Sequence, residues 1–155
     1  MRFCSAAIAS FALAAAAFGQ FRGVQAATAL PPPPVELRAG GEVEVPLLVR
    51  VRPGYHINSH RPAEEYLIPT SIAWDAAPLE IVRIDYPDAE IVRYDFSEQP
   101  LSVYSGEFEI VTVLRAPKSL PAGLASMKGK LRYQACNDKA CLAPATVDVA
   151  VAFKR

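Results

Sequence analysis

Apolar and polar residues alternate along much of this chain with a period of two, which places every second side chain on the same face of a strand. The clearest case is the segment GEVEVPLLVRV, where one face carries Val43, Val45, Leu47, Val49 and Val51. The same alternation recurs in GEFEIVTVLR and TVDVAVAF, whose in-step residues are Phe108, Ile110 and Leu114 in the first and Val147, Val149, Val151 and Phe153 in the second. Each of these segments predicts a half-buried strand.

Four shorter runs, PTSIAWD, LEIVRIDYP, AEIVRYDF and KGKLRYQAC, are also rich in strand-forming residues. Beyond the N-terminal segment, no stretch keeps a helical period over the length of a typical helix. The 14 prolines and 8 glycines lie mainly between the runs, where turns require them. The pattern predicts an all-β domain of about seven short strands, an immunoglobulin-like antiparallel β-sandwich. An antiparallel barrel is the alternative.

The first residues have the pattern of a secretory signal peptide. A single basic residue, Arg2, precedes an Ala-rich apolar run over Cys4–Phe18, and small residues follow. The run is shorter than the ~20 apolar residues of a membrane-spanning helix. We therefore expect cleavage, after either Ala26 or Ala29, rather than a retained anchor. Cleavage at either position removes Cys4.

The chain is expected to divide into three parts. We assign residues 1–26 to the signal peptide, residues 27–34 to a Pro-rich spacer and residues 35–155 to one domain. The prolines of LPPPPVEL make the spacer extended and semi-rigid. No second long apolar segment follows, which predicts a soluble exported domain.

Charge gives no indication of a polyanionic partner. The 16 basic and 16 acidic residues balance to a formal net charge of zero, which argues against nucleic acid or an acidic membrane surface as the partner. Once the signal peptide is removed, two of the three cysteines remain. That is an even number in a compartment where disulfides persist.

These two cysteines, Cys136 and Cys141, lie in the segment YQACNDKAC. Asn137 and Asp138 favour a turn, so the cysteines flank a hairpin-like turn at a separation that a disulfide tolerates. Three interpretations remain open: a structural staple, a redox-active pair and half of a zinc site. A staple across so short a loop restrains the unfolded chain by only ~2 kcal/mol. No cysteine on an earlier strand is available for a cross-sheet bridge beside Trp74.

The zinc interpretation needs further ligands, for which His56 and His60 are the candidates. Both lie in GYHINSHRP, among polar and turn-forming residues, which is the setting of ordinary surface or hydrogen-bonding histidines. We therefore expect no metal and no bound cofactor.

Motifs of other chemistry are missing from the sequence. It contains no G-x-S-x-G, no H-E-x-x-H and no phosphate-binding glycine loop. The carboxylate pairs Glu64–Glu65 and Asp85/Asp88 are explained as solvated loop charges. Two neighbouring cysteines favour thiol exchange over the acyl transfer of a cysteine protease.

Three longer segments follow each other in a recognisable order. They are GYHINSHRPAEEYLIPTSIAW at 54–74, YPDAEIVRYDFSEQPLSVYSGEFEI at 86–110 and LRYQACNDKACLAP at 131–144. Together they resemble the periplasmic N-terminal domain of the thiol:disulfide interchange protein DsbD. In the last segment, a YQ-x-C is followed by a second cysteine and a proline, which is similar to the redox hairpin of that family. The resemblance extends over about Val35 to Phe153.

The resemblance implies an immunoglobulin-like sandwich whose Cys136/Cys141 pair cycles between dithiol and disulfide. Such a domain relays electrons from a membrane-embedded thiol reductase to thioredoxin-like periplasmic proteins, which serve disulfide isomerases and cytochrome c biogenesis. By the same resemblance, Cys141 is the accessible sulfur that forms the mixed disulfide, and Cys136 resolves it. The attacking sulfur must be reachable because exchange proceeds through a thiolate that attacks a disulfide sulfur.

Members of this family also shield the cysteine pair with an aromatic loop. The segment RYDFSEQP lies in the corresponding region, and we expect Phe96 over the disulfide, with Tyr94 as the second candidate. The alternative is that Phe96 is a core residue at the end of a strand. Asp95 and Glu98 are expected to discourage thiolate formation until a partner docks.

The sequence also departs from the family pattern. Full-length members continue into a membrane domain and a thioredoxin-like domain, whereas this sequence ends at Arg155, so we expect the electron donor to be a separate protein. Some members have a longer spacing between the cysteines. The leading hypothesis is a periplasmic thiol:disulfide oxidoreductase domain, in the electron-transfer sense, without a small-molecule substrate. The alternative is an immunoglobulin-like protein-binding module with an inert disulfide.

Overall fold

The computed structural model describes residues 24–154, so the predicted signal peptide lies almost wholly outside the described residues. Within them the chain forms strands and no helix, which confirms the all-β prediction. No helix in this part of the chain is long and apolar enough to cross a membrane. In chain order the strands are β1 (Ala27–Leu30), β2 (Val35–Glu36), β3 (Glu42–Val51), β4 (His56–Asn58), β5 (Ser71–Asp75), β6 (Glu80–Asp85), β7 (Glu90–Val92), β8 (Leu101–Tyr104), β9 (Glu107–Arg115), β10 (Ser126–Tyr133), β11 (Ala135–Cys136) and β12 (Ala145–Lys154).

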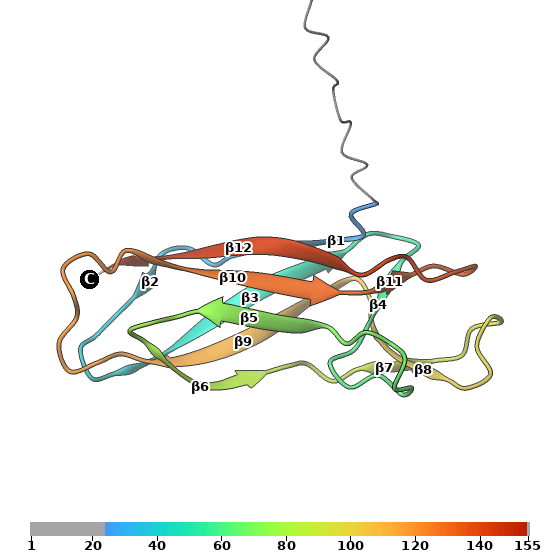
Figure 1. The fold of residues 1–155 in the computed structure, drawn as a ribbon, viewed down its shortest axis with the longest axis horizontal. Helices are drawn as coiled ribbons and strands as arrows, with labels where there is room; N and C mark the ends of the chain where they lie inside the picture. The colour runs from blue at the N-terminus through green and yellow to red at the C-terminus, as the bar shows by residue number, and fades with distance from the viewer. Residues whose placement is uncertain (1–23, 155) are drawn as a thin grey trace, which may run out of the picture.

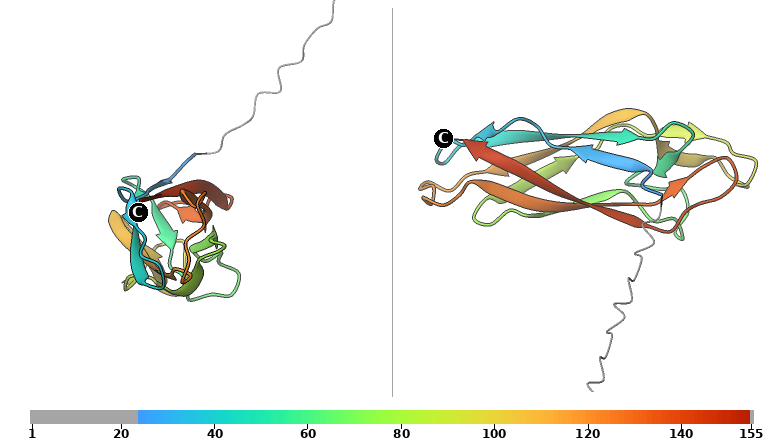
Figure 2. Two further views of the ribbon diagram at one scale, coloured as in Figure 1. Left: turned by 90° about the vertical axis from the view of Figure 1, so that its left-hand side faces the viewer. Right: turned by 90° about the horizontal axis from the view of Figure 1, so that it is seen from above.

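Two four-stranded sheets form the body of the domain, and a third lies at one end. Their strand orders are β1-β3-β9-β6, β2-β12-β10-β5 and β11-β4-β8-β7. The pairing is antiparallel except between β2 and β12, which run parallel. Figure 1 shows β4, β7, β8 and β11 gathered at the end away from the C-terminus, and the view from above in Figure 2 agrees. The predicted sandwich is confirmed, with one parallel edge strand added to it.

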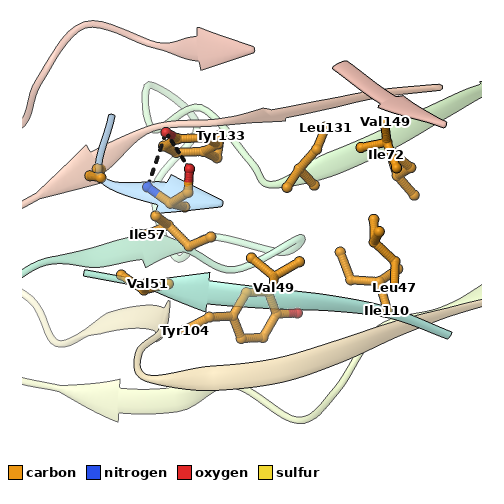
Figure 3. Packing of buried hydrophobic residues seen from close by; sticks show 13 residues of the cluster. Leu47, Val49, Val51, Ile57, Ile72, Tyr104, Ile110, Leu131, Tyr133 and Val149 are labelled. Carbon is orange, nitrogen blue, oxygen red and sulfur yellow. Dashed lines mark hydrogen bonds between the residues drawn. The ribbon is translucent and has the colours of Figure 1, made fainter. Parts of the chain in front are cut away.

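The alternating apolar residues form the core between the two large sheets (Figure 3). Leu47 and Val49 of β3 and Ile110 of β9 lie opposite Leu131 of β10 and Ile72 of β5, and all five are at most 6% exposed. Burying one side chain of this kind stabilises the fold by roughly 1.5–3 kcal/mol. Apolar residues therefore recur at every second position because those side chains face the core between the two sheets.

Trp74 of β5 links the two sheets. Its indole N–H donates a hydrogen bond of 2.9 Å to Oγ1 of Thr112 on β9, and Thr112 is fully buried. The indole ring lies over Gly129, the register partner of Trp74 on β10, where a Cβ atom would overlap the ring. The glycine is thus explained by the close approach of the ring to the backbone.

The N-terminal residues of the predicted spacer form strand β1. Ala27–Leu30 pairs antiparallel with β3. The Tyr133 hydroxyl accepts a hydrogen bond of 3.1 Å from the Ala27 N–H and donates one of 3.3 Å to the Ala27 carbonyl (Figure 3). The folded part therefore begins ahead of Val35, where the sequence pattern placed its start. Of the two predicted cleavage positions, only the one after Ala26 leaves β1 whole.

Candidate functional site

Cys136 and Cys141 form a disulfide across a tight hairpin. The S–S distance is 2.00 Å and the Cα atoms are 3.9 Å apart. The turn follows the predicted Asn-Asp chemistry: Oδ1 of Asn137 accepts hydrogen bonds of 2.9 Å from the N–H groups of both Lys139 and Ala140. Because this carboxamide satisfies two backbone donors, the short loop holds its shape without a longer strand pair.

The two sulfurs of this bridge have different surroundings. Cys136 is the last residue of β11 and is completely buried, with 0% exposure. Cys141 lies on the returning arm of the hairpin and is exposed. A thiolate from another protein therefore has a path to Cys141 and none to Cys136, so the geometry permits exchange at one end of the bridge.

A histidine is the cross-strand neighbour of the buried sulfur. Strand β11 pairs antiparallel with β4, and the register sets Cys136 opposite His56. His56 is only 4% exposed, and its Nε2 atom has no hydrogen-bond partner among the described residues. Burial lowers the pKa of His56 below its ordinary value because the imidazolium form loses hydration. His56 is therefore a neutral imidazole near neutral pH.

Two aromatic rings from the loop between β7 and β8 cover this histidine. The Tyr94 ring stacks on His56 with ring centroids 4.1 Å apart and planes inclined by 17°. Phe96 continues the stack, 5.4 Å from Tyr94 and 6.5 Å from His56 between centroids. Burial, with a contribution from Glu90, raises the pKa of Tyr94, so its hydroxyl stays protonated at neutral pH. The predicted aromatic loop thus lies over the residue beside Cys136.

The acidic residues of this loop point into solvent. Asp95 and Glu98 are both exposed, and Phe96 itself is 39% exposed. A turn holds the loop, because the Ser97 N–H donates to the Tyr94 carbonyl and the Ser97 hydroxyl donates to the Gln99 carbonyl. The carboxylates therefore border the aromatic stack rather than entering it.

The second histidine belongs to a different cluster. Nδ1 of His60 lies 2.8 Å from the Tyr104 hydroxyl, and its ring stacks on Tyr86 with centroids 4.4 Å apart. The structure thus brings one of the two candidate zinc ligands to the cysteines and keeps the other elsewhere. Among residues 24–154 there is no group of three or more potential metal ligands.

Gln134 connects two of the three segments that carry the family resemblance, 54–74 and 131–144. Its side-chain oxygen accepts hydrogen bonds from the Asn58 amide (3.2 Å) and the Ile68 N–H (3.1 Å). Its amide donates to the Leu142 carbonyl, 3.2 Å away on the exit of the cysteine hairpin. Asn58 also donates to the Ile68 carbonyl at 3.0 Å. The glutamine therefore fixes the hairpin on the segments 54–60 and 67–70, which gives those polar residues a structural role.

The family resemblance placed the cysteines and the aromatic loop together, but the sequence named His56 only as a candidate zinc ligand and not as the cross-strand partner of Cys136. Its segment, GYHINSH, alternates too briefly to show a strand, so both histidines resembled loop residues. The available sequence signal for a strand was Ile57, a β-branched apolar residue next to His56. The structure shows Ile57 fully buried. A buried isoleucine next to His56 indicates a short core strand, and the register of that strand with β11 depends on tertiary pairing.

Comparison with known proteins gives two matches. A family model described as "Thiol:disulfide interchange protein DsbD, N-terminal" matches residues 26–152. The fold is similar to the crystal structure of the N-terminal periplasmic domain of ScsB from Proteus mirabilis, with a TM-score of 0.54 and 16% sequence identity. That alignment covers 82% of this chain and 44% of the ScsB chain, so the likeness extends over less than half of the solved structure. No curated protein matches the chain.

Proposed function

Because this chain belongs to the family of DsbD N-terminal domains, we propose that it is a periplasmic thiol-disulfide exchange module whose working groups are Cys136 and Cys141. The match over residues 26–152 confirms the resemblance expected from the three sequence segments. The observation that supports the proposal most directly is the contrast between the two bonded cysteines. One is exposed and the other completely buried. A bridge that served only as a staple has no need of a sulfur open to partners.

The exchange follows from that contrast. In the oxidised domain, a partner thiolate attacks Sγ of Cys141, the Cys136–Cys141 bond breaks, and Cys136 leaves as a thiolate that takes up a proton. A second thiolate of the partner then attacks the partner's sulfur in the mixed disulfide, and Cys141 leaves as a thiolate. Two electrons pass to the domain, and the partner becomes a disulfide. The same steps in reverse reduce the disulfide of a recipient.

We place the domain between a membrane-embedded thiol reductase and thioredoxin-like periplasmic proteins, the relay implied by family membership. The described residues support a role in transfer between proteins, because the reactive end carries exposed apolar surface. Phe96 is 39% exposed and Ile91 on β7 is 70% exposed. Exposed aromatic and aliphatic side chains at a site edge favour docking of another protein.

The aromatic loop serves as a cover in this scheme. Tyr94 and Phe96 stack over His56, the neighbour of Cys136. Displacement of the loop by a docking partner uncovers His56 and, beside it, Cys136, the buried half of the bridge. Asp95 and Glu98 lie at the border of the loop, where their charge acts on an approaching thiolate.

A trapping experiment tests the proposal. The Cys136→Ala domain, with Cys141 first converted to its mixed disulfide with 2-nitro-5-thiobenzoate, should pass that coloured thiolate into solution when a thioredoxin-like domain with only its attacking cysteine is added. The mixed disulfide of the two proteins should then accumulate, because neither has a second thiol to resolve it. The Cys141→Ala domain is the matched control, because its remaining sulfur is buried. The absence of any adduct with Cys136→Ala would contradict the exchange function and leave an inert bridge in a protein-binding module.

A further inference from the structure

Exchange at this site creates a thiolate in a place that water does not reach. When a partner thiolate attacks Cys141, the leaving sulfur is that of Cys136, which has 0% exposure. An unpaired charge in an apolar interior is costly, and burial without a partner raises the pKa of a thiol. In the opposite direction, Cys136 must lose its proton before it attacks. Both directions need a proton acceptor and donor inside the fold.

His56 is placed to supply that group. It is the register partner of Cys136 in the antiparallel pair of β4 and β11. Residues directly opposite in such a pair project to the same face, with Cβ atoms ~4.5–5.5 Å apart. Cys141 continues the row on the other side, because it forms an isolated bridge with Cys136. Imidazole, resolving sulfur and attacking sulfur therefore follow one another across three adjacent segments.

The Nε2 atom of His56 is the second observation. It is buried and has no hydrogen-bond partner among the described residues. Leaving a buried acceptor unsatisfied costs about 1–3 kcal/mol, and such atoms in native folds call for an explanation. In the oxidised domain the neighbouring sulfur carries no proton. In the reduced domain Cys136 carries an S–H group, which supplies a donor on the strand that faces His56.

We propose that His56 accepts the proton of Cys136 when Cys136 resolves the mixed disulfide, and that, after taking up a proton from solvent, the imidazolium protonates Cys136 when its sulfur is the leaving group. This inference rests on the proposed exchange function and adds to it the path of the proton. In the resolving step the Cys136 S–H bond breaks, the proton passes to the imidazole, and the thiolate attacks Sγ of Cys141. The thiolate of the bound partner leaves, and the imidazolium later releases its proton to solvent or to that thiolate.

The surroundings keep His56 in the free-base form, which accepts the proton in the resolving step. Tyr94 stacks on one face of the ring, and its raised pKa keeps it neutral. The charged groups of the same loop are Arg93, Asp95 and Glu98, all exposed, and Glu90 lies near Tyr94. From β11 the group that faces His56 is Cys136 itself. Burial lowers the pKa of His56, so the free base predominates near neutral pH.

The test separates the two steps of oxidation with one reagent. The reduced domain is mixed with a stoichiometric amount of 5,5′-dithiobis(2-nitrobenzoate), an aromatic disulfide whose released thiolate is coloured. The first thiolate reports the attack by Cys141, and the second reports resolution by Cys136. His56→Phe keeps a planar ring under Tyr94 without proton transfer, and His56→Gln keeps polarity without a titratable group. His60→Gln is the matched control, because His60 stacks on Tyr86 instead.

We expect the first release to stay within about twofold of the unchanged domain in all variants. The second release should slow by about 10²-fold in both His56 variants at pH 7, the usual scale of general acid–base catalysis. The deficit should shrink as the pH rises and the thiol ionises without help, a trend that a packing defect would not produce. His60→Gln should match the unchanged domain.

A second release as fast in both His56 variants as in the unchanged domain, from pH 6 to pH 9, would overturn the role of His56 while leaving the exchange function intact. If instead the unchanged domain releases no second thiolate, the exchange function itself fails. Where His56→Phe does not fold, His56→Gln alone decides the question.

Discussion

The ring of Tyr94 lies parallel to the ring of His56, with centroids 4.1 Å apart, and so covers the residue opposite Cys136. Tyr94 comes from the loop after β7, and His56 begins β4, so two segments far apart in sequence meet beside the Cys136–Cys141 disulfide. The family resemblance placed Phe96 first and Tyr94 second as the residue that covers the disulfide. In the structure Tyr94 is the nearer of the two to His56.

Removing the aromatic rings should make the bridge easier to reach. An aromatic pair contributes about 0.5–1.5 kcal/mol, and 1.4 kcal/mol corresponds to a tenfold change in an equilibrium. Tyr94→Ala and Phe96→Ala should therefore each speed reduction by dithiothreitol several-fold, and the double variant by about tenfold. Tyr66→Ala is the control, because Tyr66 is 74% exposed and outside the stack. Unchanged reduction rates in Tyr94→Ala, Phe96→Ala and the double variant would show that the rings do not shield the bridge.

Loss of the Gln134 side chain should loosen the cysteine hairpin. Gln134→Ala removes the acceptor of the Asn58 and Ile68 donors and the donor to the Leu142 carbonyl. Partly buried groups left without partners cost about 1–3 kcal/mol, so the free energy of unfolding in urea should fall by that amount. Gln99→Ala, at an exposed position, should change it by less than about 0.5 kcal/mol. Equal effects of the two substitutions would contradict the network.

Adding a methyl group at Gly129 should destabilise the sandwich. The new Cβ would overlap the Trp74 ring and come within 3.0 Å of the Ala73 carbonyl oxygen, so the ring or the strand must move. Overpacking of this kind costs typically about 1–3 kcal/mol. The control is Gly123→Ala, where nothing lies within 4 Å of the added atom. We expect a lower midpoint of thermal unfolding for Gly129→Ala only. Similar midpoints for both variants would show that the packing of Trp74 does not require a residue without a Cβ atom at position 129.

Acid should destabilise the oxidised domain through its histidines. Burial lowers the folded-state pKa of His56, and burial together with Arg61 lowers that of His60. The unfolded chain therefore binds more protons than the folded one below about pH 6.5. The contribution of these histidines to the free energy of unfolding is complete above about pH 6.5 and is lost as the pH falls toward their folded-state pKa. For His56 the slope is at most about 1.4 kcal/mol per pH unit.

The measurement is urea unfolding of the unchanged and His56→Phe domains at pH 7, 6 and 5. The variant should lose less stability than the unchanged domain over this range, because it lacks the buried titrating group. Parallel curves would mean that His56 titrates alike in the folded and unfolded states.

The sequence predicted those features that depend on local pattern. The alternation of Val45, Leu47 and Val49 predicted β3, and Asn137 predicted the turn between the cysteines, both from neighbours in the chain. Strand β1 escaped prediction because four residues of mixed character, ATAL, become a strand only through pairing with β3. The parallel pairing of β2 with β12 likewise depends on where the chain ends meet.

The site was predictable in part for the same reason. The cysteine pair and the aromatic loop carry recognisable segments, so the family resemblance located them. The partnership of His56 with Cys136 depends on the register between β4 and β11, strands of three and two residues that no periodicity reveals. The role of Gln134 depends on three parts of the fold that the sequence does not show together: the cysteine hairpin, the segment around Asn58 and the segment around Ile68.

The most direct test of the account is the reduction potential of the Cys136–Cys141 pair. The purified domain is equilibrated in graded glutathione buffers, its free thiols are alkylated and counted, and circular dichroism monitors the fold. Structural disulfides typically lie below about −300 mV. We predict a reversible two-electron transition clearly above that value, with the β-sheet signal unchanged on reduction. A pair that stays oxidised throughout, and opens only when the domain unfolds, would contradict the exchange function.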